Sequence, residues 1–218
     1  MGVAPVRSVP SFDPSTVRLI AITDSLRDGP RGLALRAAAA VAGGATMIQL
    51  RLKEESARSL VEIARTIQAM VPEVPLIVND RADVALAAGA AGVHVGVDDL
   101  SPALLRRVVP SGFVIGASVG NDEEVARAAG ADYVGIGPVF ATGSKSDAGA
   151  AIGPVRFGEL ARRCGLPSVA IGGITSERVP SVLVAGAAGV AVISALFGAP
   201  DPTLAARSIR NALDATGR

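Results

Sequence analysis

The stretch VLVAGAAGVAVIS, Val182–Ser194, decides between two very different folds for this chain of 218 residues. It opens an uncharged run that continues to Ala199 and is long enough to cross a membrane as one apolar helix. Gly186 and Gly189 interrupt the run, and glycine is unfavourable inside a helix. We therefore interpret the stretch as the end of a helix, a turn at 186–189 and a buried strand, and not as a membrane span.

Seven other short apolar runs are similar to this last strand. They are nearly continuous in apolar residues, which is typical of parallel strands buried on both faces. The eight predicted strands are 19–23, 46–50, 76–79, 92–95, 113–118, 133–137, 168–172 and 189–194. Segments with helical spacing lie between them, such as 56–70 and 122–129, and a last helix is expected at 203–213. The apolar face of the segment 56–70 consists of Leu60, Ile63, Ala64 and Ile67.

A Gly-Ala pair precedes every second predicted strand. The four pairs are Gly44-Ala45, Gly89-Ala90, Gly130-Ala131 and Gly186-Ala187. Glycine at these positions indicates the left-handed residue that ends the preceding helix. Eight strands that alternate with helices, joined by two alternating kinds of connection, predict an α/β fold of the (β/α)₈ TIM-barrel type. A doubly wound open sheet is the alternative, but it usually has fewer strands at this length.

Composition and charge exclude several classes of protein. Hydrophobic residues make up 50% of the chain and aromatic residues 3%, while 21 Lys and Arg against 20 Asp and Glu give a net charge of +1. The chain is too apolar to be disordered, and it lacks the basic excess and the stacking residues of a nucleic-acid-binding protein. A single cysteine, Cys164, forms no internal disulfide, so a cytoplasmic location is expected. We expect a loose tail without signal-peptide character at 1–17 and one barrel domain at 18–218.

Polar residues follow the predicted strands at their carboxyl ends, where barrels of this kind place the active site. These residues are Gln49, Arg51, Lys53, Asn79, Asp80, Asp99, Ser118, Gly173 and Ser194. A long loop at 138–153 adds Thr142, Ser144 and Lys145, and we expect it to act as a lid. Because all eight strand ends meet at one rim, the side chains should share one site.

Two anion-binding regions are expected at this rim. The glycines after the seventh strand and the turn after the eighth lie where such barrels commonly bind a phosphate through backbone N–H groups. The second region combines Arg51, Lys53 and Lys145 with the carboxylates of Asp80 and Asp99. Mg²⁺ takes one or two carboxylates together with phosphate oxygens, so this group predicts a diphosphate and a Mg²⁺ ion. For any single residue, a solvated ion pair is the alternative interpretation.

Residues for other kinds of chemistry are scarce. The only histidine, His94, lies inside the fourth predicted strand, and we interpret it as a packed barrel residue rather than a general base. The chain has no His and Cys cluster for zinc and no evident Ser-His-Asp set. The chemistry should therefore need little proton transfer, as in the departure of a diphosphate assisted by Mg²⁺ and cations.

Several short motifs lie at and near the predicted strand ends. The motifs are Ile22-Thr23-Asp24, Gln49-Leu50-Arg51-Leu52-Lys53, Asn79-Asp80-Arg81, Gly92–Gly96, Gly116-Ala117-Ser118, Gly135–Phe140, Thr142–Lys145 and Ala170–Ile174. They occur in the order found in thiamine phosphate synthase, and the chain resembles that family over about residues 19–197. The resemblance implies a Mg²⁺-dependent transferase. In that family an aminopyrimidine-methyl diphosphate loses diphosphate through a pyrimidine-methyl cation, and the nitrogen of a thiazole phosphate attacks the methylene to give thiamine phosphate.

The resemblance also implies roles for the residues at the rim. Arg51, Ser118 and Lys145 would act in catalysis. The pyrimidine diphosphate would be held by Gln49, Arg51, Lys53, Asn79, Ser118 and Lys145, and the thiazole phosphate by Thr142, Ser144, Gly173, Ile193 and Ser194. Asp80 and Asp99 would hold Mg²⁺. Two positions depart from the family pattern, since Val97 replaces the usual Gln and Ser144 the commoner Thr.

Three alternatives stay open beside the synthase. A thiazole tautomerase relative has the same fold, but it typically lacks the paired carboxylates and has a histidine at the position of Gly120. A sugar-phosphate isomerase on a similar barrel would use Asp80 and Asp99 as acid and base. A barrel that only binds ligands is the third. The expected partners are small-molecule substrates, with neither nucleic acid nor membrane, and a homo-oligomer is allowed.

Overall fold

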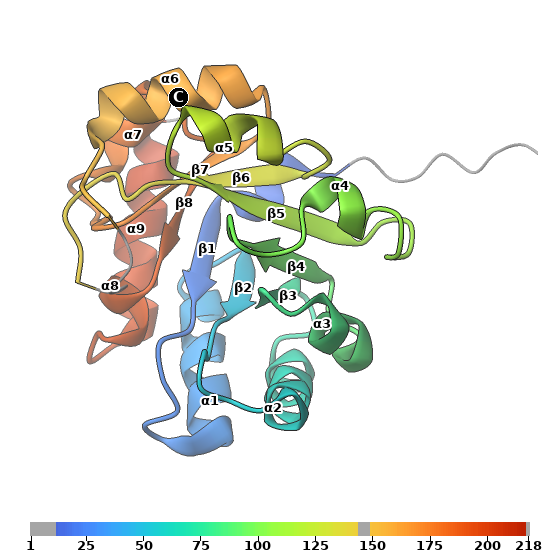
Figure 1. Ribbon diagram of the computed structural model, residues 1–218. Helices are drawn as coiled ribbons and strands as arrows, with labels where there is room; N and C mark the ends of the chain where they lie inside the picture. Colours follow the sequence, from blue (N-terminus) through green and yellow to red (C-terminus); the bar gives the residue numbers. More distant parts are fainter. Residues whose placement is uncertain (1–11, 144–148, 217–218) are drawn as a thin grey trace, which may run out of the picture.

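A closed barrel of eight parallel strands forms the centre of the computed structural model, which describes residues 12–143 and 149–216 (Figure 1). Each strand pairs with the next one in sequence, and the last pairs with the first, so the sheet has no free edge. The strands are β1 Leu19–Ile22, β2 Met47–Leu50, β3 Leu76–Asn79, β4 Gly92–Val95, β5 Val114–Val119, β6 Tyr133–Ile136, β7 Ser168–Ile171 and β8 Gly189–Val192. The predicted (β/α)₈ barrel is confirmed.

Helices connect the strands and cover the outside of the barrel (Figure 1). They are α1 Gly29–Ala42, α2 Ala57–Met70, α3 Ala82–Ala88, α4 Pro102–Leu105, α5 Asp122–Arg127, α6 Gly153–Cys164, α7 Val179–Val184, α8 Ser194–Phe197 and α9 Pro202–Thr216. The short helix α8 was not expected. It starts directly after the eighth strand, so the predicted strand 189–194 ends earlier, at Val192.

The stretch Val182–Ser194 is divided as the sequence analysis predicts, into the end of α7, a turn and β8. No helix in the described part of the chain is both long and apolar enough to span a membrane. The glycines of all four Gly-Ala pairs have positive φ, from 70° at Gly89 to 111° at Gly44. Because a side chain disfavours this backbone conformation, glycine is needed where each helix turns back into a strand.

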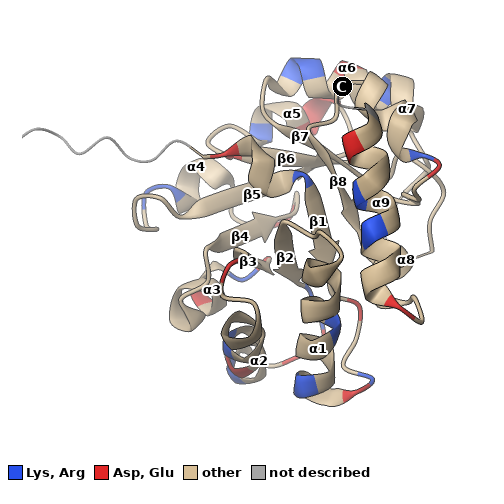
Figure 2. Cartoon of the chain, turned by 180° about the vertical axis from the view of Figure 1, so that it is seen from behind, with Lys and Arg blue, Asp and Glu red and all other residues tan. Residues whose placement is uncertain are grey.

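The larger apolar core lies between the strands and the surrounding helices. The predicted face of α2 belongs to it, and Leu60, Ile63, Ala64 and Ile67 are all buried there. Burial of each large apolar side chain stabilises the fold by about 1.5–3 kcal/mol. In Figure 2 the charged residues lie on helices and loops, while the strands carry almost none.

A smaller apolar cluster fills the inside of the barrel and includes Ile20, Met47, Ile77 and Tyr133. A short 3₁₀ helix at Pro14–Val17 precedes β1, and the side chain of Val17 is fully buried. The ring of Phe12 stacks on Tyr133 with 6.0 Å between ring centroids. The expected loose tail 1–17 therefore differs at its end, because residues 12–17 pack against the barrel; residues 1–11 lie outside the described part.

Candidate active site

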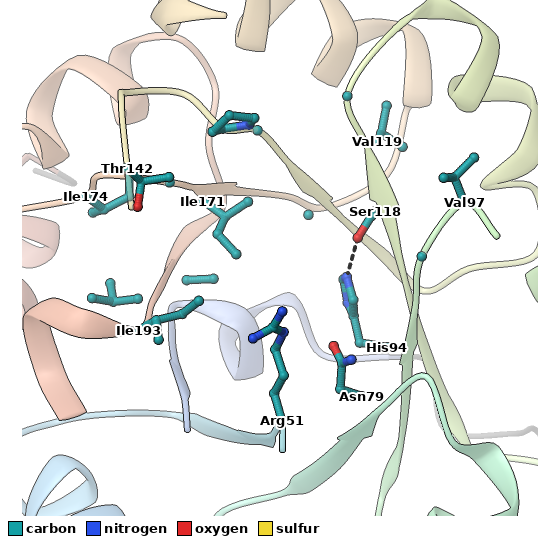
Figure 3. Close-up of a pocket in the computed structure, with 18 of the residues that line it drawn as sticks. Arg51, Asn79, His94, Val97, Ser118, Val119, Thr142, Ile171, Ile174 and Ile193 are labelled. Carbon is teal, nitrogen blue, oxygen red and sulfur yellow. Dashed lines mark hydrogen bonds between the residues drawn. The ribbon is translucent and has the colours of Figure 1, made fainter. Parts of the chain in front are cut away.

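A cavity of about 410 Å³ opens at the carboxyl ends of the strands (Figure 3). The predicted site residues that line it are Arg51, Lys53, Asn79, Asp80, Asp99, Ser118, Thr142, Gly173, Ile193 and Ser194. Ser144 and Lys145 lie outside the described residues. The barrel thus brings together residues that follow seven different strands. In Figure 3, Arg51, Asn79 and Ser118 lie on one side of the cavity, and Thr142 and Ile193 lie on the other.

Gln49 does not line the cavity, although the sequence analysis expects it to contact the substrate. Its side chain is only 4% exposed, and its amide Nε2 donates to Oδ1 of Asn79 at 2.8 Å. This bond occupies the carbonyl of Asn79 and turns the amide NH₂ of Asn79 away from Gln49. The structure therefore places Gln49 behind Asn79, where it orients that amide.

Arg51 follows β2 and extends its guanidinium into the cavity (Figure 3). Its backbone is held by the buried hydroxyl of Thr23 at the end of β1. That hydroxyl accepts from the backbone N–H of Arg51 at 2.8 Å and donates to its carbonyl oxygen at 3.2 Å. Both backbone groups of Arg51 are thus satisfied just beyond the last pairing of β1 with β2.

Asp80 and Asp99 form a pair of neighbouring carboxyl groups. Asp80 is the only residue other than glycine with positive φ in the described part of the chain, at 62°. Strain of this kind is found most often at functional sites. Its N–H donates to the carbonyl of His94 at 2.8 Å, and Oδ2 of Asp99 accepts from the N–H of Gly96 at 2.8 Å. The backbone of Asp80 and the carboxylate of Asp99 are therefore held by β4 and by the residue that follows it.

The electrostatics of this pair suit a divalent cation. Burial, and then the charge and the hydrogen bond of Asp99, raise the pKa of Asp80 to about 6, while Lys53 and Arg51 act in the opposite direction. A carboxyl whose ionisation is disfavoured by a neighbouring carboxylate gains from a bound cation, and Mg²⁺ takes one or two carboxylates beside phosphate oxygens. The described residues contain no group of three or more acidic, His or Cys ligands. The carboxylate pair could thus hold a divalent cation only with further ligands from outside the described residues, such as phosphate oxygens or water.

His94 lies in the wall of the cavity and is only partly buried. Its Nε2 is 3.1 Å from Oγ of Ser118 (Figure 3), and its Nδ1 is 3.0 Å from the hydroxyl of Tyr133. Burial raises the pKa of Tyr133, so its hydroxyl keeps its proton and can donate to Nδ1. In the neutral tautomer that accepts from Tyr133 at Nδ1, the ring hydrogen is on Nε2 and points to Ser118, and the hydroxyl of Ser118 can then donate to another acceptor.

The sequence analysis interpreted His94 as packing alone and missed its contact with Ser118. Glycines on the two following strands carry the signal that reveals it. A Cβ on Gly116 would lie 2.5 Å from Nδ1 of His94, and one on Gly135 would lie 3.2 Å from Cε1. Glycine inside a strand marks the close approach of another group. At Gly135 that group is the imidazole ring, and at Gly116 it is the imidazole together with the ring of Tyr133, whose Cζ would lie 2.3 Å from the Cβ.

Glycine-rich turns form the opposite side of the cavity. Gly173 has a φ of 62°, and a Cβ there would lie 2.6 Å from the carbonyl oxygen of Ala141. Arg178 donates to the carbonyl of Gly173 at 2.6 Å and lies over the ring of Phe140 at 4.7 Å. Arg178 thus joins the turn after β7 to the first residues of the loop after β6.

Val97 and Glu124 also line the cavity, although neither is a predicted site residue. Val97 is 37% exposed at the rim, at the position where the family pattern usually has Gln. Glu124 accepts from the N–H of Gly120 at 2.7 Å, while Asn121 accepts from the first N–H groups of α5. This reciprocal capping of a helix explains Glu124 without a role in the chemistry.

The fold and the cavity define a (β/α)₈ barrel with cations, a carboxylate pair and glycine-rich turns around one rim. A family model described as thiamine monophosphate synthase matches residues 19–196, which is most of the barrel. The chain belongs to the thiamine monophosphate synthase family, and the predicted resemblance is confirmed.

Individual relatives agree with the family match. The thiamine-phosphate synthase of Methanoculleus marisnigri is 52% identical, over 81% of this chain and 85% of its own length. That of Azorhizobium caulinodans is 46% identical, over 94% of this chain and 99% of its own. The solved structure of thiamine phosphate pyrophosphorylase from Pyrococcus furiosus has a TM-score of 0.84 and 35% identity, and the match covers 94% of this chain and 99% of that one.

Proposed function

We propose that this chain is a transferase that makes thiamine phosphate from an aminopyrimidine-methyl diphosphate and a thiazole phosphate. One observation carries the proposal within this family. Arg51, Lys53 and the carboxylate pair line the same cavity as Gly173 and Ser194. In Figure 3, Arg51 and Asn79 lie across this cavity from Thr142. The cavity therefore offers separate places for a diphosphate and a phosphate.

The diphosphate belongs on the side of Arg51, Lys53 and Asn79. A guanidinium binds phosphate oxygens through two parallel N–H donors, and Arg51 has a backbone fixed by Thr23. The amide NH₂ of Asn79, oriented by Gln49, adds a donor for a phosphate or for the pyrimidine. Lys145 of the loop after β6 is proposed as a further cation, as the family pattern implies. These charges stabilise the negative charge that develops on a departing diphosphate.

Asp80 and Asp99 are the residues that would hold Mg²⁺. When bound, Mg²⁺ neutralises charge on the diphosphate and so makes it a better leaving group. The strained backbone of Asp80 directs its carboxylate next to that of Asp99 before any ligand binds. Pre-organisation of this kind avoids a rearrangement of the acids during the reaction.

Ser118 is placed to contact the pyrimidine or the diphosphate. His94 occupies one lone pair of the Ser118 hydroxyl at 3.1 Å, so the hydroxyl hydrogen is directed to the substrate. Ionisation of the carbon–oxygen bond to diphosphate requires no general base. This agrees with a site in which the imidazole is used to orient a hydroxyl.

The thiazole phosphate belongs on the opposite side, with Thr142, Gly173, Ile193 and Ser194. The family pattern implies Ser144 as a further contact. Backbone N–H groups of glycine-rich turns bind phosphate without a side chain in the way. A phosphate held there directs the thiazole toward the pyrimidine across the cavity. Holding two reactants in this relation makes their reaction effectively unimolecular.

The composition supports a proposal for where the enzyme acts and which kinds of partner it has. We place it in the cytoplasm, acting on small molecules without a nucleic-acid or membrane partner, as a monomer or a homo-oligomer. The single cysteine and the nearly balanced charge support this setting.

Diphosphate release from purified protein tests the proposal. We expect release only when both substrates and Mg²⁺ are present, and we expect a chelator to abolish it. Absence of thiazole-dependent release at every Mg²⁺ concentration would contradict the synthase function. Conversion of a thiazole isomer without the pyrimidine substrate would favour the tautomerase alternative instead, which the carboxylate pair and Gly120 disfavour.

A further inference from the structure

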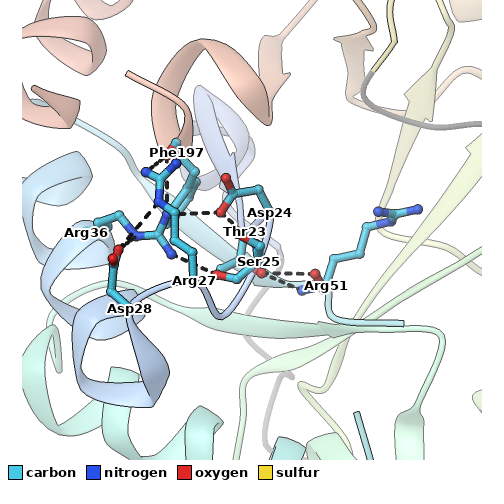
Figure 4. A network of polar contacts seen from close by, with 8 residues as sticks. All are labelled: Thr23, Asp24, Ser25, Arg27, Asp28, Arg36, Arg51 and Phe197. Atoms are coloured by element: carbon cyan, nitrogen blue, oxygen red, sulfur yellow. Dashed lines mark hydrogen bonds and ion pairs between the residues drawn. The ribbon is translucent and has the colours of Figure 1, made fainter. Parts of the chain in front are cut away.

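A network of polar contacts joins α1, the loop after β1 and the end of α8 (Figure 4). Arg36 of α1 lies at its centre with a side chain that is 11% exposed. Its Nη2 donates to the carbonyl of Ser25 at 2.7 Å, and its Nη1 donates to Oδ1 of Asp24 at 3.3 Å. Its Nε forms an ion pair with Asp28 at 3.5 Å. One buried guanidinium thus holds three residues of the β1–α1 loop.

The same guanidinium reaches the last residue of α8. The carbonyl oxygen of Phe197 accepts from Nη1 of Arg36 at 3.4 Å and from Nη2 of Arg27 at 2.6 Å. The ring of Phe197 is fully buried, with its centroid 5.9 Å from the guanidinium carbon of Arg36. Two cations at the carboxyl end of α8 stabilise its unpaired carbonyl and complement the helix dipole.

This anchored helix begins in the wall of the cavity. Ser194 and Ala195, the first residues of α8, line the cavity on the side proposed for the thiazole phosphate. Since α8 has only four residues, the position of its carboxyl end determines the position of its first N–H groups. The contacts of Arg36 with Phe197 therefore set where those groups lie.

The loop that Arg36 holds also reaches the other side of the cavity. Thr23, directly before Asp24, binds both backbone groups of Arg51 through its hydroxyl. Figure 4 shows the two sets of contacts side by side, with the hydroxyl of Thr23 on Arg51 and the guanidinium of Arg36 on the following residues. Arg36 and Thr23 together connect α8 with the backbone of Arg51.

We infer that Arg36 is a positioning residue that fixes the phosphate side of the cavity relative to Arg51. The inference rests on the proposed function, because it needs a phosphate group at the start of α8. Arg36 does not line the cavity, so its effect passes through the elements that it holds, α8 and the β1–α1 loop. A planar guanidinium reaches several acceptors at once, whereas a lysine ammonium in its place would satisfy fewer of them.

Steady-state kinetics with each substrate varied in turn tests the inference. In Arg36→Met we expect the KM for the thiazole phosphate to rise about tenfold, as the loss of a charge-assisted contact implies. The KM for the pyrimidine diphosphate should stay within about twofold, because the hydroxyl of Thr23 still holds Arg51. Arg36→Lys should restore the thiazole KM only in part. Arg31→Met, at an exposed position of the same helix, is the matched control and should change neither constant.

An equal rise in both KM values, or no rise in either, would overturn the inference. If Arg36→Met does not fold, Arg27→Met removes the other donor to Phe197 and should raise the thiazole KM in the same direction. Calorimetric titration with inorganic phosphate tests the positioning role of Arg36 separately from the proposed synthase function, since it needs no turnover. Weaker phosphate binding by the Arg36 variants supports the positioning role even if the wild-type protein makes no thiamine phosphate. If the wild-type protein makes thiamine phosphate and the Arg36 variants bind phosphate as tightly as it does, the positioning role is contradicted and the proposed function is not.

Discussion

Asp80 shows how one residue carries both strain and charge in this site. Its backbone has a φ of 62°, which costs free energy for any residue with a side chain, and its pKa is raised to about 6 by burial and by Asp99. A carboxyl whose pKa is higher in the folded state than in the unfolded state is destabilising when ionised at neutral pH. Neither the positive φ nor the raised pKa of Asp80 stabilises the barrel. The proposed role of Asp80 as a Mg²⁺ ligand would account for both costs.

The substitution Asp80→Asn separates the cost of the strained backbone from the cost of the buried, ionised carboxyl group. Asparagine tolerates positive φ well, so the backbone should keep its course. With one carboxylate removed, we expect diphosphate release to fall by about a hundredfold or more at any Mg²⁺ concentration. The free energy of unfolding at neutral pH should stay equal or rise, because the raised pKa makes the ionised acid unfavourable. Steady-state assays and urea unfolding measure the two quantities.

A control with the same change in charge is Glu62→Gln, at an exposed position of α2. It should leave both the rate and the stability close to the wild-type values. A wild-type rate in Asp80→Asn would show that Asp80 does not hold the metal.

At the scale of elements, α2 and α8 show two ways of building a helix. α2 begins at a serine cap, where the Ser56 hydroxyl accepts from the N–H of Ser59 at 3.2 Å, and it buries a regular apolar face. The cap and the apolar periodicity of its own sequence are enough to predict α2. α8 has four residues and depends on Arg27 and Arg36, which lie at least 160 residues before Phe197 in the sequence. Tertiary contacts therefore decide whether it forms and where it lies.

Removing the cap of α2 tests the local part of this contrast. In Ser56→Ala the free energy of unfolding should fall by about 1 kcal/mol, because an N–H of the first turn loses its acceptor. Ser56→Asp keeps an acceptor at the same position and should retain most of the stability. Urea denaturation of the three proteins gives the comparison. Equal stability of Ser56→Ala and the wild type would mean that water replaces the cap at no cost.

At the scale of the whole molecule, the barrel has a polar rim and an apolar base. Phe12 and Tyr133 close the base, and the hydroxyl of Tyr133 contacts His94 above it. His94 in turn contacts Ser118 in the cavity wall. The interior thus changes from stacked rings to hydrogen-bonded side chains along the barrel axis.

The substitution Phe12→Ala tests whether the base is separate from the rim. We expect the free energy of unfolding to fall by about 1–2 kcal/mol, from lost apolar burial and lost stacking on Tyr133. Both KM values should be unchanged, since Phe12 lies at the opposite end of the barrel from the cavity. Phe12→Leu should recover much of the stability. Thermal unfolding and steady-state kinetics are sufficient, and a changed KM would show that the base and the rim are coupled.

Much of the candidate site was predictable because it depends on position along the strands. A residue at or directly after the end of a parallel strand lies at the rim of a barrel whatever its neighbours are, so Arg51, Asp80 and Ser118 were placed there from local pattern. Gln49 has the same periodicity as Arg51, and yet it lies behind Asn79. Periodicity determines the side of a strand and not the depth, which depends on how the neighbouring strands are aligned.

The sequence by itself determined the alternation of strands and helices, the glycine turns between them and the residues that gather at the rim. These features depend on contacts between residues close in the chain and on the period of the apolar pattern. Only the tertiary structure decided that His94 contacts Ser118, that Gln49 orients Asn79 and that Arg36 anchors α8. Each of these contacts joins segments brought together by the closure of the barrel, and no local pattern records which side chains then meet.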